Sequence, residues 1–157
     1  MPPMHRRAAS LGFTLIEILL AIAIVAVLMF VAAPSYSSYV ERTRVNQATI
    51  DIVAISAQVK AYELDNRDIP DTLAQVGAGG KLDPWGRPYV YLPFRTPKDK
   101  GQARKDKNLV PINSDFDLYS VGKDGDSTAP LTAKQSRDDV VRANDGAFVG
   151  LASDYTQ

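Results

Sequence analysis

The chain has 157 residues, 18 basic and 18 acidic side chains, and no cysteine. A formal net charge of zero does not suggest a nucleic-acid-binding protein, and the lack of cysteine excludes a disulfide framework and thiolate chemistry. The single histidine is His5, so the rest of the chain lacks the imidazole of Ser-His-Asp, Cys-His and most zinc sites. We therefore do not expect an enzyme.

The first predicted element is an apolar helix. Only Thr14 and Glu17 interrupt the apolar stretch Phe13 to Ala33, and a helix of this length crosses a hydrocarbon core about 30 Å thick. Basic residues precede it, which predicts a cytoplasmic N-terminus. A secretory signal has its small-residue cleavage site after a shorter run, whereas Gly12 precedes this one. From the residues alone, cleavage behind Gly12 and an uncleaved signal anchor are both open.

The helical pattern continues beyond Pro34, a residue that usually kinks a helix. We predict one long helix from about residue 14 to residue 65. Residues 13–34 are its membrane-spanning segment and residues 35–66 its amphipathic segment. Apolar residues of the second segment recur at spacings of three and four, which predicts one face packed on a globular domain: Val45, Ala48, Ile52, Ile55, Val59 and Tyr62.

Residues 67–157 are the predicted globular domain. The sequence predicts a short helix or turn from Asp71 and strands at Tyr89–Leu92 and Phe116–Val121. The charged stretch Arg95–Asn108 predicts a loop, with Lys98–Lys107 as a solvated excursion; a filament contact with acidic neighbours or a contact with a secreted substrate is the alternative. From Ser127 onward the sequence predicts loop, with at most one short helix near Asp138–Arg142. The fold class is α+β, with a long N-terminal helix packed on a small antiparallel sheet.

The stretch "GFTLIE" ahead of an apolar run resembles the leader junction of type IV pilins and type II secretion pseudopilins. This resemblance implies that residues 1–12 are a leader, that prepilin peptidase cuts between Gly12 and Phe13, and that the new Phe13 terminus is N-methylated. Pro34 falls where such proteins have a helix-distorting proline. In the implied filament, Glu17 of one subunit neutralises the Phe13 ammonium of its neighbour. Pairing within one chain, or a place near the lipid headgroups, is the alternative.

The charge on Glu17 needs such a partner. An unpaired carboxylate in hydrocarbon costs about 2.5–3.5 kcal/mol. Two opposite charges 4 Å apart interact by about 4 kcal/mol at an effective dielectric constant of 20. The pairing therefore offsets the burial cost in order of magnitude.

The stretch "DPWGRPYVY", from Asp83 to Tyr91, resembles a motif of the major pseudopilin of type II secretion. Pro84 and Gly86 shape a turn there, and Trp85 fills core. The resemblance implies a subunit of a type II secretion pseudopilus that polymerises to drive protein export across the outer membrane. A type IV pilin of a surface fibre, for adhesion, motility or DNA uptake, is the alternative. Two further alternatives are a membrane-anchored periplasmic enzyme and an anchored calcium-binding module that does not polymerise.

The same resemblance implies partners and a location. The partners are further copies of the chain in a helical homopolymer, minor pseudopilins, the inner-membrane secretion platform and prepilin peptidase. The location is the bacterial inner membrane, crossed once, with a periplasmic C-terminal domain that enters a periplasmic filament after assembly.

"FDLYSVGKDGD" followed by "RDDV" resembles the loop that folds round one calcium ion in major pseudopilins. Type IV pilins often staple this region with a disulfide, which a chain without cysteine cannot form. Calcium takes six to eight oxygen ligands. The inserted stretch "DSTAPLTAKQS" lengthens the loop, makes Asp126 a competing ligand and weakens the assignment of Ser136; a solvated acidic loop is the alternative. The implied ligands are the side chains of Asp124, Asp138 and Asp139 and the backbone carbonyls of Val121 and Ser136.

Overall fold

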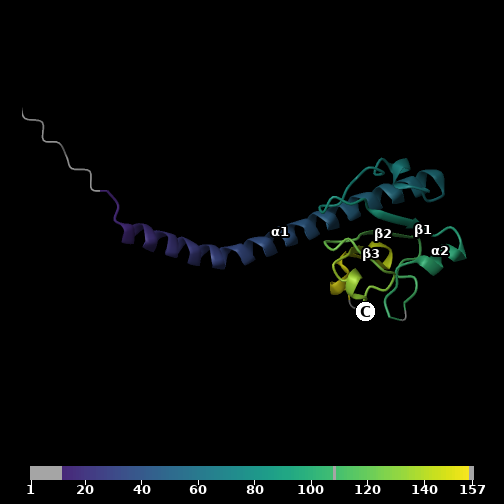
Figure 1. Cartoon of the computed structure of the whole chain (residues 1–157). Coiled ribbons are helices and arrows are strands. Elements are labelled where there is room, and N and C mark those ends of the chain that lie inside the picture. The colour runs from purple at the N-terminus through teal and green to yellow at the C-terminus, as the bar shows by residue number, and fades with distance from the viewer. Residues whose placement is uncertain (1–11, 108, 156–157) are drawn as a thin grey trace, which may run out of the picture. The chain divides into compact units, whose positions relative to one another are not determined.

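The computed structural model describes residues 12–107 and 109–155, apart from the side chains at positions 31, 32 and 34. Predicted leader residues 1–11 and Asn108, the end of the predicted charged loop, lie outside the described residues. Contacts divide the chain into two units, Met1–Val40 and Glu41–Gln157. The elements (Figure 1) are α1 (Leu15–Asn66), η1 (Leu73–Val76), β1 (Val90–Pro93), α2 (Pro97–Gln102), β2 (Phe116–Ser120), η2 (Lys134–Ser136), β3 (Val140–Ala143), η3 (Asn144–Gly146), β4 (Phe148–Leu151) and η4 (Ala152–Asp154).

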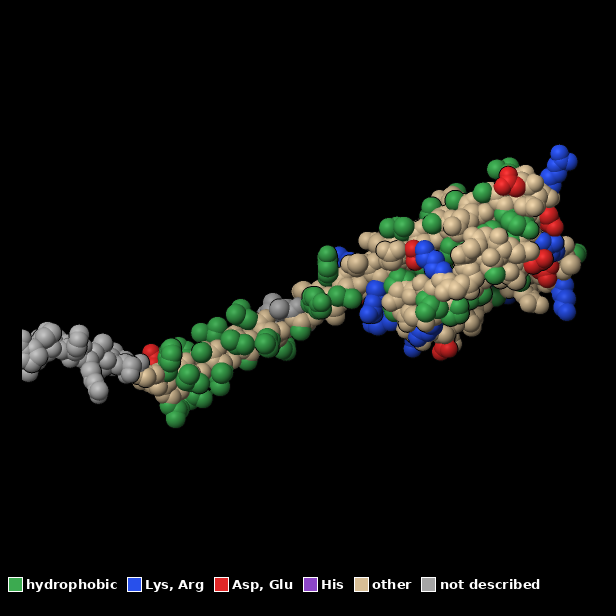
Figure 2. Space-filling view, turned by 90° about the horizontal axis from the view of Figure 1, so that it is seen from above, with side chains coloured by type: hydrophobic (Ala, Val, Ile, Leu, Met, Phe, Trp, Pro, Cys, Tyr) green, Lys and Arg blue, Asp and Glu red, His purple; other side chains and the backbone are tan. Residues whose placement is uncertain are grey.

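The first unit holds the N-terminal part of α1. A reciprocal cap starts this helix: the Glu17 N–H donates to Thr14 Oγ1 at 3.3 Å, and the Thr14 N–H donates to Glu17 Oε2 at 2.8 Å. Hydrophobic side chains cover this part of the surface (Figure 2), and Phe13 and Val25 are exposed. Among the described residues, α1 is the helix long and apolar enough to cross a membrane, by length and composition. The predicted apolar helix is confirmed; α1 also runs through position 34, where a role of Pro34 in assembly stays a prediction.

In the second unit, the rest of α1 buries one face. Ala48, Ile52, Ile55 and Val59 are each at most 1% exposed and belong to one core with side chains of β2 and β3. Their spacing of three and four residues puts them on one side of the helix. The predicted amphipathic segment is therefore confirmed. The helix ends at Asn66, and the next residue has a left-handed φ of 56°.

The sheet is antiparallel, with strand order β1-β2-β3-β4. Tyr91 pairs with Leu118 between β1 and β2, and Val141 of β3 pairs with Gly150 of β4. The first two strands lie within one residue of the predicted bounds. The prediction of loop after Ser127, with a helix near Asp138–Arg142, was wrong, because β3 and β4 lie in that stretch.

A second core covers the face of the sheet that points away from α1. Side chains alternate along a strand, so Val140 packs in the α1 core while its neighbour Val141 packs in the second core. Val141 meets Ile112 and Leu131, which come from the segments on either side of β2, and Tyr155 near the end of the chain. These long connections therefore form a layer over the sheet.

The predicted charged loop takes part in that layer. Residues 97–102 form α2, which begins with Pro97 behind a capping box of Thr96 and Asp99. Ala103, Arg104 and Asp106 are buried, at 1%, 3% and 5% exposure. The prediction of a solvated excursion over Lys98–Lys107 was therefore wrong for the second half of the segment. The sequence does not indicate this burial, because the stretch is rich in charged residues and contains no run of apolar residues.

Candidate functional site

The predicted processing and assembly residues lie at the start of α1. Phe13 is 84% exposed. Oε2 of Glu17 accepts hydrogen bonds from the Thr14 N–H and the Thr14 hydroxyl, both at 2.8 Å. The Phe13 ammonium, its predicted partner, exists only after cleavage behind Gly12. Cleavage, methylation and the pairing between subunits therefore stay predictions at this point.

The Asp-Pro-Trp-Gly stretch forms a turn held by a buried carboxylate. Oδ1 of Asp83 accepts from the backbone N–H groups of Trp85 at 3.0 Å and Arg87 at 2.8 Å. Its Oδ2 accepts from the hydroxyl of Ser120, at the end of β2, at 2.5 Å. Gly86 has a φ of 86°, which favours glycine. The motif builds a turn onto the sheet, and Trp85 is partly buried against the α1 core, as predicted.

The turn also reaches the loop that follows β2. Nη1 of Arg87 donates to the carbonyl of Gly122 at 2.8 Å and to that of Lys123 at 3.5 Å. The guanidinium lies against Gly125, where an added Cβ would stand 2.5 Å from Nη2. Arg87 thus donates hydrogen bonds to two backbone carbonyls of the loop for which calcium binding is predicted.

Two predicted calcium ligands, Asp124 and Asp138, accept hydrogen bonds from backbone N–H groups of this loop. Oδ2 of Asp138 accepts from the backbone N–H groups of Lys123 at 2.8 Å and Asp124 at 2.9 Å. Oδ1 of Asp124 accepts from the Asp126 N–H at 2.9 Å. Both carboxylates therefore already act as acceptors for the chain that surrounds them. Val121 is half-buried directly after β2.

The third predicted carboxylate, Asp139, is fully buried and pairs with an arginine. Nη2 of Arg104 donates to its Oδ2 at 2.5 Å, and the Ser127 hydroxyl donates to the same oxygen at 2.6 Å. Burial raises the pKa of Asp139 to about 6, which leaves it ionised at neutral pH. Ser136 is buried beside it, and its carbonyl accepts from the Asp139 N–H at 3.3 Å.

These residues do not fit a calcium ion in the arrangement they have. No group of three or more His, Cys, Asp or Glu side chains within residues 12–107 and 109–155 is placed to hold a metal ion. Asp139 points its bonded oxygen at a guanidinium, and the Ser136 carbonyl is already an acceptor. The calcium ligand set stays a prediction from the resemblance.

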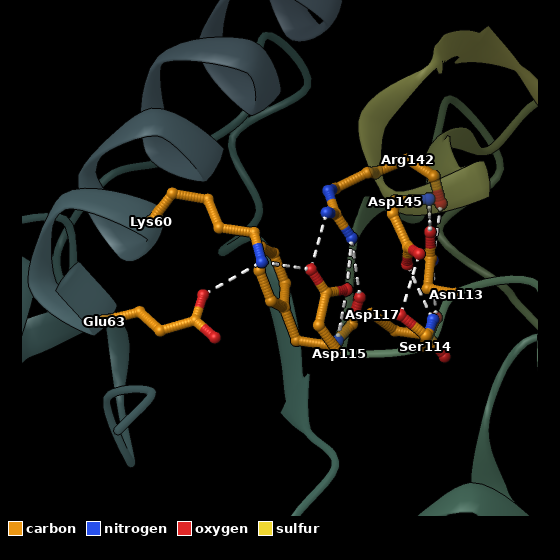
Figure 3. Close-up of polar contacts among 9 residues, drawn as sticks. Lys60, Glu63, Asn113, Ser114, Asp115, Asp117, Arg142 and Asp145 are labelled. Atoms are coloured by element: carbon orange, nitrogen blue, oxygen red, sulfur yellow. Dashed lines mark hydrogen bonds and ion pairs between the residues drawn. The ribbon is translucent and has the colours of Figure 1, made fainter. Parts of the chain in front are cut away.

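A second buried arginine ties the sheet to α1 (Figure 3). Arg142 is 2% exposed and makes a two-bond contact with Asp115, at 2.8 and 2.9 Å. Its guanidinium also donates to the Phe116 carbonyl at 3.0 Å and lies 4.0 Å from that ring centre. Lys60 of α1 reaches Asp115 at 2.8 Å and Glu63 at 2.9 Å.

Sequence reasoning missed both buried arginines. Arg142 lies in the otherwise apolar stretch Val-Val-Arg-Ala. This pattern could have indicated a buried strand with one arginine pointing into the core. Arg104 has no such signal beyond the adjacent Ala103, because its carboxylate partner is 35 positions away. Both guanidinium groups bond to oxygens of the chain itself, which makes them part of the structural core.

Comparisons with known proteins agree with a structural role. The model of type II secretion system protein G matches residues 35–136, and the model of the prokaryotic N-terminal methylation motif matches residues 7–33. Type II secretion system core protein G of Pseudomonas aeruginosa is 34% identical over 143 residues, covering 78% of this chain and 89% of the relative. The protein of the same name from Dickeya chrysanthemi is 32% identical over 119 residues, covering 73% and 78%.

A fimbrial protein of Pseudomonas aeruginosa is 34% identical over only 61 residues, which is 39% of this chain and 40% of that protein. Comparison with solved structures gave no significant match. Similarity to the secretion proteins thus extends over most of the chain, whereas similarity to the fimbrial protein does not. The chain belongs to the type II secretion protein G family, the major pseudopilins, which are structural proteins and not enzymes.

Proposed function

We propose that the chain enters the inner membrane through the apolar part of α1, with its N-terminus in the cytoplasm and its second unit in the periplasm. Prepilin peptidase then cuts between Gly12 and Phe13 and methylates the new terminus. This is supported by the methylation-motif match over residues 7–33 and by an exposed apolar helix that starts directly after the cut. Leader residues 1–11 lie outside the described residues, and Gly12 is the first described residue.

The processed subunits polymerise with further copies and with minor pseudopilins on the inner-membrane platform. The resulting periplasmic filament drives folded proteins across the outer membrane. One observation carries this assembly step: Glu17 is the sole charged residue from Phe13 to Val40, within a helical surface whose apolar side chains are exposed. A surface of this kind is covered either by lipid or by like helices.

Glu17 has hydrogen-bond donors in its own chain, but within residues 12–107 and 109–155 no Lys or Arg forms an ion pair with it. The two bonds from Thr14 satisfy acceptor sites on one carboxylate oxygen. They cannot neutralise the charge, whose cost in hydrocarbon is about 2.5–3.5 kcal/mol. The Phe13 ammonium of a neighbouring subunit contributes about 4 kcal/mol at 4 Å and a dielectric constant of 20. Assembly therefore gives the Glu17 carboxylate a counter-charge from a neighbouring subunit.

The experiment uses a single cysteine at Val25→Cys, which is unique because the chain has no other cysteine. Val25 is 48% exposed on the apolar helix. Oxidative crosslinking in cells then reports helix contact between subunits. Glu17→Leu and Glu17→Gln are compared in this background, with leader removal followed by the change in mass and methylation by N-terminal mass.

The two variants separate charge pairing from helix capping. Glutamine keeps the capping acceptor for Thr14 and loses only the charge. We expect both variants to be inserted and cut, yet to lose most of the crosslink and most of the methylation. Normal crosslinking in Glu17→Gln would show that Glu17 only caps the helix, and normal crosslinking in both would refute the pairing.

A further inference from the structure

Arg104 is fixed in the layer over the sheet by its backbone as well as by its side chain. Its N–H donates to Oδ2 of buried Asp117 at 2.6 Å, and its carbonyl accepts from the Ile112 N–H at 3.0 Å. The next residue, Lys105, exchanges backbone hydrogen bonds with residues 129 and 131, both at 2.9 Å. The segment between β1 and β2 is therefore bonded to the long loop between β2 and β3.

The side chain of Arg104 lies inside this junction. Its guanidinium lies 4.4 Å from the centre of the Tyr119 ring, donates to the Ser127 hydroxyl and pairs with Asp139. The side chains of the ion pair are 3% and 0% exposed. A buried carboxylate needs a partner of opposite charge, because transfer of an isolated charge out of water costs several kcal/mol. The protein itself supplies that partner here.

Within the ion pair itself, the positive charge of Arg104 balances the negative charge of Asp139. Two atoms of this ion pair have no hydrogen-bond partner within the described chain, Oδ1 of Asp139 and Nε of Arg104. One is an acceptor and the other a donor, so the pair contains no surplus of acceptor oxygens. A loop shaped around a divalent cation would instead gather several acceptors with no cation of their own.

A second guanidinium, that of Arg87, bonds to backbone carbonyls of the same loop. Arg87 donates to the carbonyls of Gly122 and Lys123, directly after Val121. Carboxylates and backbone carbonyls are the two kinds of oxygen that calcium binds in proteins. In this chain the Asp139 carboxylate and two carbonyls of the loop each already face an arginine from another part of the fold.

We propose that Arg104, together with Arg87, which bonds to the start of the same loop, closes the loop between β2 and β3 in place of calcium. The segment between β1 and β2 then has a definite role: it delivers the cation that neutralises Asp139. The C-terminal region of this pseudopilin keeps its fold when calcium is removed. This inference concerns the fold of the second unit and does not depend on how the filament assembles.

The test measures thermal unfolding of the full chain, purified in detergent, by circular dichroism, in excess EGTA and in millimolar calcium. Arg104→Gln is compared with Lys98→Gln, which removes one exposed positive charge from the same segment. Arg104→Gln/Asp139→Asn removes both charges of the buried pair and is included in case the single variant does not fold. Equilibrium dialysis with radioactive calcium measures binding directly.

We expect wild-type Tm to agree within about 2 °C in EGTA and in calcium, with no bound calcium at micromolar concentration. Arg104→Gln loses about 10 °C or more, because it leaves a buried charge unpaired, while Lys98→Gln stays within about 2 °C of wild type. The double variant regains at least half of the loss. Stoichiometric calcium binding by wild type, with a Tm that falls in EGTA, would overturn the proposal, and so would an Arg104→Gln variant as stable as Lys98→Gln.

Discussion

The contact between Asp115 and Arg142 gives the sharpest prediction for the second unit. The change is Asp115→Asn, which keeps the shape of the side chain and removes its charge. Arg142 is 2% exposed and bonds both of its terminal nitrogens to this carboxylate (Figure 3). The variant therefore leaves a buried guanidinium without its counter-ion.

Two independent magnitudes bracket the size of the effect. Removal of one partner from a buried ion pair costs about 3–5 kcal/mol. Burial alone would raise the pKa of Asp115, but hydrogen bonds from Arg142 and Lys60 hold it at about 2, below its ordinary 3.8. That difference corresponds to about 2 kcal/mol of stabilisation by the charged form. We expect the variant to lose about 3 kcal/mol of unfolding free energy at pH 7.

The pKa also fixes how the loss depends on pH. A carboxylate with a lowered pKa in the folded state stabilises the fold above its unfolded pKa, here 3.8, and this contribution disappears as pH falls toward 2. The difference between wild type and Asp115→Asn should therefore be largest above about pH 5 and shrink by about 2 kcal/mol toward pH 2.

Urea unfolding of the full chain in detergent, followed by tryptophan fluorescence at several pH values, measures this difference. Asp68→Asn is the matched control, since Asp68 pairs with Arg95 at 3.0 Å but its side chain is 61% exposed. An exposed pair contributes less than about 1 kcal/mol. If Asp115→Asn lost no more than Asp68→Asn at pH 7, or if its loss did not vary with pH, the assignment of a buried ion pair would be refuted.

Two further substitutions test the turn after β2 and the contact between α1 and the sheet. Gly122→Ala places a Cβ 2.2 Å from the Asp138 carbonyl oxygen at a φ of 65°, so we expect a loss of about 3 kcal/mol or more in the same urea assay. Gly80→Ala, where nothing lies within 4 Å, should change stability by less than about 0.5 kcal/mol, and equal losses in the two variants would contradict the steric argument. Tyr89→Phe removes the hydroxyl that donates to Asp51 of α1 at 2.9 Å, and we expect a loss of about 1 kcal/mol; an unchanged midpoint would mean that this bond adds nothing net.

The sequence determined the elements whose signals are local. Hydrophobic side chains at spacings of three and four predicted the buried face of α1 around Ile52 and Ile55, and the structure confirms it. The prepilin-like stretch from Gly12 to Glu17 identified the family, which the matches over residues 7–33 and 35–136 bear out. Turn residues between Asp83 and Gly86 predicted the turn before β1. Each of these signals lies within a few neighbouring residues.

The tertiary structure alone decided the C-terminal half of the second unit. β3 and β4 have only four residues each, and the inward Arg142 breaks the apolar pattern of β3. That arginine is acceptable in the core only because Asp115, 27 positions earlier, lies directly before the neighbouring strand β2. Arg104 likewise appears as one more charge in a charged stretch until the fold brings Asp139 against it. A charged side chain is buried or exposed according to its partner, and partners so distant along the chain are set by the fold.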